Sequence, residues 1–362
     1  MIDCVRRKVL EDLGYNANLD KHRKEQNLLN FGVGRIISEH KERYIVRTEE
    51  DKLEAEIVGN LRFSAKNRSD FPAVGDWVAI SAYDKKKVLI HHIFPRKSII
   101  EREAVGKPGE KQIIATNIDS ALIVQAVDRD FNINRIERYL TICNASKVKS
   151  VIILNKIDLI SDAQLNSILD GINQRINNVP IVAISNETQV GYEELLEYIL
   201  KGKTYCLLGS SGVGKSTLLN NISGKTLMRT DSISLSTNKG RHVTSHRELI
   251  ILENGGILID NPGMREVGIA DATSGLEITF NTILKLSQNC RFKDCMHIHE
   301  KGCAILEAVG NGDIDKNIYE NYMKLEGEKT HYESTVAEKR KKDKDFGKMI
   351  KNFKKNRGLH KY

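Results

Sequence analysis

The sequence has no apolar stretch long enough to cross a bilayer. Its longest runs, such as SALIVQAV, fall well short of the roughly 20 residues that a membrane-spanning helix needs. The polar start MIDCVRRKVLEDLG also lacks the apolar centre of a secretory signal. We therefore expect a cytoplasmic protein with no membrane partner.

Cysteine is scarce as well, with six in 362 residues. So few cysteines do not make a disulfide scaffold in a chain of this length. Three of the six lie within residues 290–303, which predicts thiolate metal ligands in a reducing compartment. Cys4, Cys143 and Cys206 are expected to be ordinary buried thiols.

Only the region near the C-terminus has an excess of positive charge. Residues 339–361 hold eleven Lys and Arg against two Asp, so the net charge of +8 lies there and the remainder is close to neutral. Such a tail is either a solvated extension or a clamp for RNA phosphates. The sequence shows no internal repeat, and its length with 40% hydrophobic residues predicts two or three domains.

Residues 32–103 alternate between apolar and polar positions in short segments. Five of them, GVGRIIS, RYIVRT, LEAEIVG, DWVAIS and KVLIHHIF, are separated by turn signals, which is typical of a small β-barrel. Barrels of this size often bind oligonucleotides, and the alternative is a spacer barrel with a solvated basic face. The oligonucleotide hypothesis assigns charge or base stacking to Arg47, Arg62, Lys66, Arg68, Tyr44 and Phe63.

From about residue 112, buried strands alternate with helices. SALIVQAV, SVIILNK, PIVAIS and KTYCLLG are typical of the strands, and NRIERYLTICNASK, DAQLNSILDGINQRI and YEELLEYIL of the helices. This alternation predicts a mostly parallel sheet covered on both faces. From about residue 275 the pattern is helical around the cysteines.

A phosphate-binding loop is predicted between KTYCLLG and KSTLLNNIS, because G-x-x-x-x-G-K-[ST] fits there in a strand-loop-helix context. Lys215 would neutralise β and γ oxygens, and the Ser216 hydroxyl can bind magnesium. An ATPase or kinase is compatible with this motif alone. The loop residues are Gly209, Ser210, Ser211, Gly212, Val213, Gly214, Lys215, Ser216 and Thr217.

A base-reading loop is predicted directly after the strand SVIIL. The Asp158 carboxylate can accept both N1–H and N2–H of guanine, whereas adenine offers an acceptor at N1. Asn155 would bond the base edge or tie the loop together, and the Lys156 stem can cover the ring. Ser185 and Asn186 end the next strand, where GTPases commonly have a Ser-Ala turn whose backbone N–H touches guanine O6.

The strand in GILIDNPG ends in Asp-x-x-Gly. Asp260 can hold the magnesium shell through water, and the Gly263 N–H can meet the γ-phosphate. A Thr hydroxyl of the preceding polar loop would complete the magnesium site with Ser216 and Asp260. We assign this role to Thr244, with Ser245 as the alternative.

The residue after Gly263 is Met264, where many GTPases carry a glutamine that orients the attacking water. Methionine cannot do this. Either hydrolysis is slow until another group arrives, or a neighbouring side chain such as His242 positions the water as the catalytic residue.

The phosphate loop follows the base-reading loop in this chain, the reverse of the usual order. Taken as a ring, however, the five loops keep the cyclic order of a conventional GTPase. We therefore predict a circularly permuted domain whose chain is cut at a different point. The Asp-x-x-Gly segment then leads straight into the cysteine cluster, and its movement could reorient the C-terminal part.

The segment NCRFKDCMHIHEKGCAI predicts one structural zinc ion. Three thiolates and one imidazole suit a closed tetrahedral site. His299 could replace His297, but the spacing favours His297. The predicted ligands are Cys290, Cys295, His297 and Cys303.

Together these motifs resemble the circularly permuted ribosome-biogenesis GTPases of the RsgA/YjeQ type over nearly the whole chain. The resemblance rests on PAVGDWVAI, PRKSIIERE, NKIDL, GSSGVGKSTL, GRHVTSHREL, DNPGMRE and C-x4-C-x-H-x5-C. It implies an extension (1–28), an OB-fold barrel (29–108), a P-loop GTPase domain (109–274), a zinc-binding helical domain (275–337) and a basic tail (338–362).

The resemblance also implies a function. Members bind the small (30S) ribosomal subunit late in its maturation, and the subunit stimulates their GTP hydrolysis. We therefore expect a monomeric hydrolase with the 30S subunit, 16S rRNA, GTP and GDP as partners and Mg²⁺ bound with GTP. His242 matches the family histidine proposed to act on water, whereas Val243 departs from the usual GRHTT loop beside Thr244. The alternative is a GTP-regulated rRNA-binding module in which hydrolysis is incidental.

Overall fold

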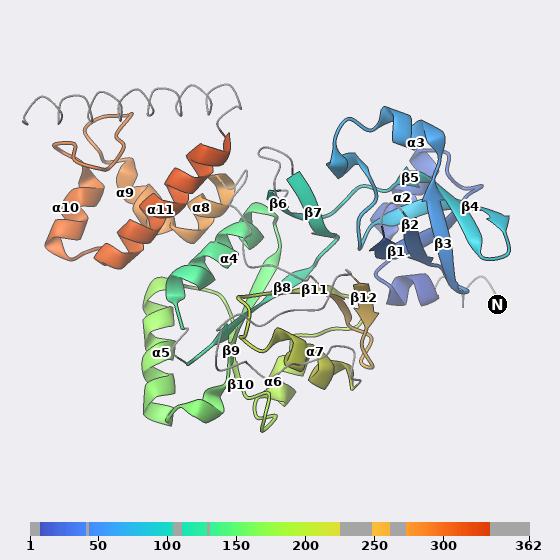
Figure 1. Ribbon diagram of the computed structural model, residues 1–362. Coiled ribbons are helices and arrows are strands. Elements are labelled where there is room, and N and C mark those ends of the chain that lie inside the picture. Colours follow the sequence, from blue (N-terminus) through green and yellow to red (C-terminus); the bar gives the residue numbers. More distant parts are fainter. Residues whose placement is uncertain are drawn as a thin grey trace, which may run out of the picture.

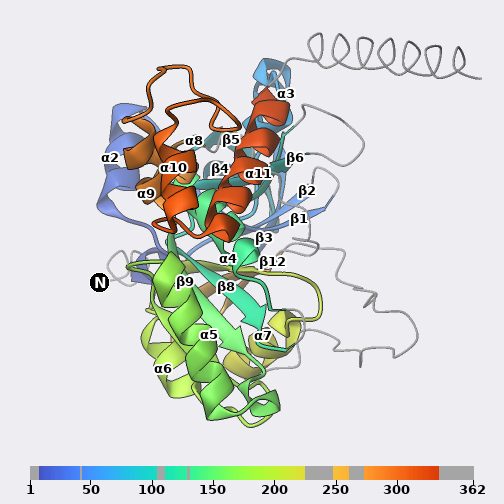
Figure 2. The same ribbon diagram turned by 90° about the vertical axis from the view of Figure 1, so that its left-hand side faces the viewer.

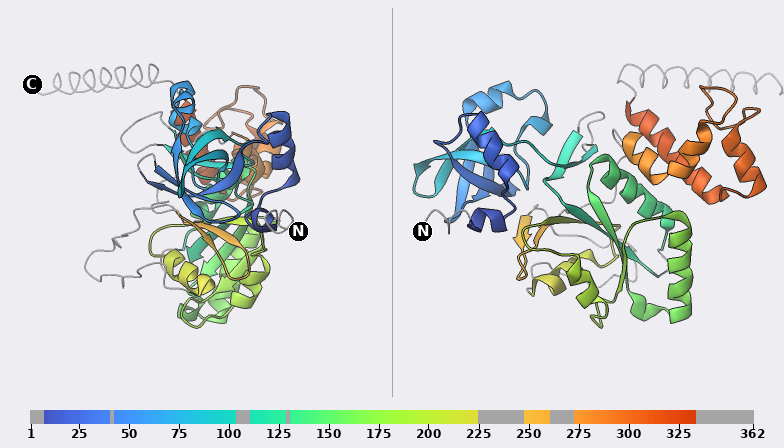
Figure 3. Two further views of the ribbon diagram at one scale, coloured as in Figure 1. Left: turned by 90° about the vertical axis from the view of Figure 1, so that its right-hand side faces the viewer. Right: turned by 180° about the vertical axis from the view of Figure 1, so that it is seen from behind.

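The computed structural model describes residues 8–40, 43–103, 111–128, 131–224, 248–260 and 273–333. Within these ranges the chain forms a β-barrel, a central sheet with helices on both faces, and a C-terminal group of helices (Figure 1). Figures 1 and 3 show the barrel and the C-terminal helices apart from each other, joined through the central part. This architecture confirms the predicted fold class.

Five strands close the N-terminal barrel. Hydrogen-bonded neighbours follow the order β1-β2-β3-β5-β4, and β4 returns to β1. Alternate residues of these strands point inward and form one buried cluster, which explains the period of two in the sequence. The strands are β1 (Gly32–His40), β2 (Arg43–Arg47), β3 (Lys52–Ile57), β4 (Trp77–Asp84) and β5 (Lys87–Ile93).

Tyr44 is part of the barrel core, with 1% of its surface exposed, so the prediction that it stacks on nucleic acid is wrong. It lies on the inward face of β2 together with Val46. Phe63, in contrast, is 95% exposed. It lies on α3 (Gly59–Ser64), a short helix with no buried residue that the alternation did not predict.

The segment before the barrel folds against it. Helix α2 (Ala17–Glu25) begins at Asn16, whose side chain accepts hydrogen bonds from the backbone N–H groups of Asn18 and Leu19. The sequence pattern did not predict this helix. The shared buried cluster consists of Leu13, Tyr15, Leu19, Val33, Trp77, Ala79 and Phe94.

The central sheet has the order β10-β9-β8-β11-β13-β12. All neighbours are parallel except β12, which runs antiparallel to β13. Its strands are β8 (Ser120–Ala126), β9 (Lys149–Asn155), β10 (Ile181–Ile184), β11 (Thr204–Leu208), β12 (Glu248–Ile251) and β13 (Ile257–Asp260).

Helices cover both faces of this sheet. The buried side chains of β8 alternate between two clusters: Ile123 packs on the side of α4 and α5, and Leu122 on the side of α6 and α7. This two-sided burial explains why the strands are continuous apolar runs. The helices are α4 (Ile133–Ala145), α5 (Asp162–Arg175), α6 (Tyr192–Glu197) and α7 (Lys215–Ser223).

A buried arginine joins the barrel to the central sheet. Arg35, on β1, is 1% exposed and donates to the Leu13 carbonyl (2.6 Å), the Gly75 carbonyl (3.2 Å) and Thr204 Oγ1 (2.9 Å). Burial lowers the pKa of Arg35 to about 10, while the negative charge of the nearby Asp119 acts in the opposite direction. The guanidinium therefore remains charged at neutral pH. The two sheets also pair directly, at Ser38 of β1 and Glu248 of β12.

A two-stranded hairpin lies between the barrel and the central sheet. Strands β6 (Ile99–Glu103) and β7 (Lys111–Thr116) pair antiparallel, and the sequence analysis predicted neither. The boundary proposed at residues 108/109 falls in their connection, outside the described residues, and stays a prediction.

The C-terminal helices pack on α4, as Figures 1 and 2 show. Arg138 of α4 forms a two-pronged ion pair with Glu328 of α11, and the buried Glu137 accepts from Arg175 and Asn321. The C-terminal elements are α8 (Thr273–Thr279), α9 (Asn281–Ser287), α10 (Ala304–Asn311) and α11 (Lys316–Glu333). In the ranges described, none of the helices combines the length and apolarity needed to span a membrane.

Candidate nucleotide site and metal centre

The glycine-rich loop connects β11 to α7 as predicted. A Cβ at Gly209 (φ +149°) would lie 2.3 Å from the Val124 carbonyl oxygen, and Gly214 (φ +96°) caps α7 in a left-handed conformation. Lys215 Nζ donates to the carbonyls of Gly209 and Ser210, at 2.8 and 2.6 Å. Ser216 and Thr217 lie half-buried in the first turn of α7, where unpaired N–H groups favour anions.

The loop with the N-K-x-D motif begins at the carboxyl end of β9. Asn155 is 1% exposed, and its Nδ2 donates to the Val213 carbonyl at 2.7 Å. Of the two roles considered for Asn155, this contact favours tying the loops together. The base-reading loop and the phosphate loop are two of the five predicted loops, and the hydrogen bond between Asn155 and Val213 brings them to one edge of the sheet.

Asp158 lies in a short 3-10 helix, η2 (Ile157–Leu159), with its side chain exposed. Ser185 Oγ donates to Asp158 Oδ1 at 2.5 Å, while Ser185 itself is fully buried. The backbone N–H groups of Glu187 and Thr188 donate in turn to Ser185 Oγ. The serine hydroxyl therefore orients the carboxylate, a role that the sequence analysis did not give it.

Lys156 has a left-handed backbone (φ +69°), and its Nζ lies 2.7 Å from Asp128 Oδ2. Asp128 follows β8, the neighbouring strand, and sequence reasoning missed it because nothing in the local sequence links it to the loop. The ion pair holds the lysine stem along the loop that carries Asp158. The helix α4 contributes Tyr139, whose hydroxyl hydrogen-bonds to Ser210 and whose pKa is raised by burial.

Part of the predicted site lies outside the described residues: His242, Val243, Thr244, Ser245, Gly263 and Met264. Asp260 ends β13, which pairs with β11 beside the phosphate loop, but only its backbone is described. The magnesium assignments for Thr244 and Asp260 and the catalytic assignment for His242 stay predictions.

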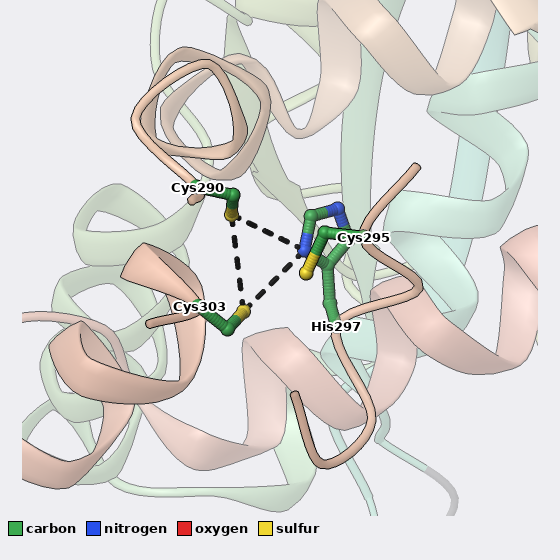
Figure 4. A group of neighbouring side chains, drawn as sticks. All are labelled: Cys290, Cys295, His297 and Cys303. Carbon is green, nitrogen blue, oxygen red and sulfur yellow. Dashed lines mark hydrogen bonds between the residues drawn. The ribbon is translucent and has the colours of Figure 1, made fainter. Parts of the chain in front are cut away.

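Four predicted metal ligands converge between α9 and α10 (Figure 4). Their ligand atoms all lie within 4.8 Å of one another. The distances are 3.9 Å from Cys290 Sγ to Cys303 Sγ, and 3.6 and 3.5 Å from these sulfurs to His297 Nδ1. Tetrahedral zinc with ordinary bond lengths needs about 3.8 Å between sulfurs and about 3.6 Å between sulfur and nitrogen. Together with Cys295, the donor set therefore fits this metal.

Two further residues shape the metal loop. The Glu300 carboxylate accepts from the backbone N–H groups of Met296, Ile298 and His299, and these bonds lower its pKa to about 2. Tyr319 of α11 donates to the His297 carbonyl at 2.6 Å. The spacing of the four metal ligands in the sequence predicts neither the Glu300 contacts nor the Tyr319 contact.

The cysteines outside the cluster behave differently. Cys143 and Cys206 are fully buried, and burial raises the pKa of Cys143 to about 12. Their thiols are thus protonated and inert, as expected from the sequence. Cys4 lies outside the described residues.

The fold and the site define a class. A parallel sheet with a phosphate loop after β11 and an N-K-x-D loop after the earlier strand β9 is a P-loop GTPase fold with permuted chain order.

Similarity to solved structures agrees with this class. The crystal structure of YjeQ from Thermotoga maritima matches with a TM-score of 0.60 and 27% identity, covering 81% of this chain and 96% of that one. The crystal structure of YloQ, described as a circularly permuted GTPase, matches with a TM-score of 0.59 and 25% identity, covering 84% and 97%.

The RsgA GTPase family model matches residues 93–270. A relative from Bacteroides thetaiotaomicron, named small ribosomal subunit biogenesis GTPase RsgA 1, is 39% identical over 345 residues, 95% of this chain and 96% of its own. One from Methanosarcina acetivorans, with the name small ribosomal subunit biogenesis GTPase RsgA, is 39% identical and covers 90% and 87%. The chain belongs to the RsgA family of GTPases. A model of ABC transporters also matches residues 193–354, which include the phosphate loop common to P-loop hydrolases.

Gly214 offers a test of this geometry. A Cβ there would lie 2.3 Å from Asn155 Nδ2 and 2.6 Å from Asn186 Nδ2, on a backbone that disfavours side chains. We expect Gly214→Ala to cost about 2 kcal/mol or more of nucleotide binding, so the Kd of a fluorescent GDP should rise about thirtyfold. Gly171→Ala on α5 is the control, because its Cβ meets only Ile133 Cδ1 at 3.7 Å. Equal Kd values for the two variants would contradict the described loop packing.

Proposed function

We propose that this GTPase acts in the late maturation of the small (30S) ribosomal subunit, which it binds and which stimulates its hydrolysis of GTP. The support is the similarity to relatives named for small ribosomal subunit biogenesis over most of their length. Hydrolysis converts GTP to GDP and phosphate, and a Mg²⁺ ion bound with GTP would neutralise charge on the phosphates.

The base end of the proposed GTP site uses the loops after β9 and β10. Asp158 accepts from guanine N1–H and N2–H, the Lys156 stem covers the ring, and the turn at Ser185 and Asn186 contacts guanine O6 through the Asn186 N–H, which also donates to Asn155 Oδ1 at 3.2 Å. The observation that carries this proposal is the Asn155–Val213 hydrogen bond, because it sets the base loop beside the phosphate loop. Asp158 keeps its second oxygen for the base while Ser185 holds the first.

The phosphate end uses the loop from Gly209 to Thr217. Lys215 turns from its loop carbonyls towards the β and γ oxygens, and the N–H groups around it cradle the phosphates. Ser216, Thr244 and Asp260 would hold magnesium, the Gly263 N–H would meet the γ-phosphate, and His242 would position the attacking water in place of the glutamine that many GTPases carry where this chain has Met264.

The zinc cluster is proposed to be structural, with one ion per chain. Four protein ligands leave no position open for a substrate, and a bound zinc would supply only rigidity to the loop between α9 and α10. The protein is proposed to act as a monomer and to contact 16S rRNA through this helical unit, the barrel and the basic tail.

Measuring phosphate release from GTP with and without purified 30S subunits tests the function. We expect the subunit to raise the rate by more than tenfold, because Met264 leaves the isolated protein without the usual water-orienting side chain. A chain that binds 30S in a GTP-dependent manner, but whose hydrolysis the subunit does not change, would instead be a GTP-regulated rRNA-binding module.

Phe63 is the exposed group on the barrel that we expect to stack on an RNA base. It is 95% exposed on a helix with no buried residue, next to the exposed Arg62, Lys66 and Arg68. A stacked base is worth about 1–3 kcal/mol, so Phe63→Ala should weaken 30S binding about fivefold to a hundredfold. Tyr83→Ala is the matched control, an exposed aromatic residue at the end of β4. If both variants bind 30S like the original chain, base stacking by Phe63 is ruled out.

A further inference from the structure

The side chain of Asn186 joins the base loop to the phosphate loop. Its Nδ2 donates to the Gly214 carbonyl at 2.9 Å, and its backbone N–H donates to Asn155 Oδ1 at 3.2 Å. Asn155 Nδ2 donates to the carbonyl of Val213, the residue before Gly214. Two asparagine amides from two different strand ends therefore hold two consecutive carbonyls of the phosphate loop.

The Asn186 amide orientation is fixed by a second pair of residues. Tyr192 OH donates to Asn186 Oδ1 at 2.8 Å, while Asn221 Nδ2 donates to the Tyr192 oxygen at 2.9 Å and to the Asn186 carbonyl at 3.0 Å. Because the amide oxygen already accepts from Tyr192, the amide nitrogen must face Gly214. Burial raises the pKa of Tyr192 to about 12, so its hydroxyl keeps the donated proton at neutral pH.

The Gly214 carbonyl is a sensitive place for this contact. It also accepts the first hydrogen bond of α7, from the Leu218 N–H. Asn186 thus holds the beginning of the helix that carries Lys215 and Ser216. The alanine that GTPases commonly have at this turn offers the same backbone N–H but no side-chain donor or acceptor.

We propose that Asn186 is a positioning residue that couples the base end and the phosphate end of the bound nucleotide. The proposal rests on the nucleotide site described under the proposed function. When the base loop holds the guanine, the phosphate loop is then already in position to bind the phosphates of the same nucleotide. Both ends gain from a preformed arrangement, because its ordering cost has been met during folding.

The ligands that separate this role from a general structural one are GDP and guanosine. Guanosine uses only the base end, where Ser185, Asp158 and the backbone N–H of residue 186 remain in Asn186→Ala. We expect this variant to bind GDP about fivefold more weakly, the usual effect of one lost hydrogen bond. Its guanosine affinity should stay within about twofold of the original, with both Kd values measured by competition against a fluorescent GDP.

Tyr192→Phe is the second variant, since it removes only the hydroxyl that orients the amide. It should weaken GDP binding in the same direction, and the double variant should be no weaker than Asn186→Ala alone, because both act through one contact. Asn173→Ala, at an exposed position of α5, is the control.

Equal weakening of GDP and guanosine by Asn186→Ala, or no weakening of GDP, would overturn the coupling role. The variant Asp158→Asn distinguishes an error in the coupling role from an error in the proposed nucleotide site. If Asp158→Asn leaves both affinities unchanged, the proposed nucleotide site is wrong. If it weakens both while Asn186→Ala changes neither, the site stands and only the coupling is lost.

Discussion

Asp158→Asn should lower the affinity for GTP about a hundredfold and allow xanthosine triphosphate to bind in its place. The carboxylate accepts two guanine N–H groups, and a hydrogen bond to a charged group is worth about 1.5–3 kcal/mol. An asparagine presents an N–H where guanine also presents one. Xanthine carries a carbonyl in place of the 2-amino group, so the new amide can donate to it.

The variant is suited to this test because its fold contact survives. Ser185 Oγ donates to Asp158 Oδ1, and an asparagine Oδ1 can accept the same bond. Competition of GTP, xanthosine triphosphate and ATP against a fluorescent GDP gives the three affinities. Asp162→Asn, an exposed residue in the first turn of α5, is the control. If ATP competes as well as GTP in the original chain and Asp158→Asn has no effect, the protein is instead an ATPase or kinase.

Removal of the metal should unfold the loop between α9 and α10 and release the helices it joins. Structural zinc contributes about 10–16 kcal/mol in small zinc domains. Cys303 is 3% exposed and is the N-cap residue of α10. Losing the metal that Cys303 would bind therefore exposes both the cluster and the beginning of this helix. We expect His297→Ala to lose the bound zinc and to be cleaved by protease near residues 290–303.

His299→Ala is the matched control, because His299 lies two residues away with an exposed side chain outside the cluster. It should keep one zinc per chain, measured by elemental analysis, and resist protease like the original. Nucleotide binding should persist in both variants, since the nucleotide loops lie on the central sheet. Loss of zinc from His299→Ala with retention in His297→Ala would reverse the ligand assignment.

Much of this fold is readable from the sequence because its signals are local. The barrel strands alternate with period two because one face is buried, and β8, β9 and β11 are continuous apolar runs because both faces are buried. The phosphate loop carries its own glycines, since positive φ and close contacts, with backbone at Gly209 and with two asparagine side chains at Gly214, exclude a Cβ there.

Other features depend on contacts between distant segments. Alternation placed Tyr44 on a face but could not say which face, and tertiary packing put it inside. Strands β6 and β7 are stabilised by pairing with each other, and neither strand gives a clear pattern in the sequence on its own. Asp128, Tyr192 and Asn221 enter the candidate site through partners on other strands or helices, which no spacing rule records.

The buried Arg35 has a practical consequence for dissecting the protein into parts. Its donors reach the Leu13 carbonyl before the barrel and Thr204 at the start of β11. A fragment holding the barrel alone would keep the cation and its bond to the Gly75 carbonyl but lose these two acceptors, and removing partners from a buried charge is strongly destabilising. The natural unit for isolating the proposed RNA-facing surface is therefore the N-terminal segment, barrel and central sheet together, and a shorter piece would present a surface that the whole molecule never has.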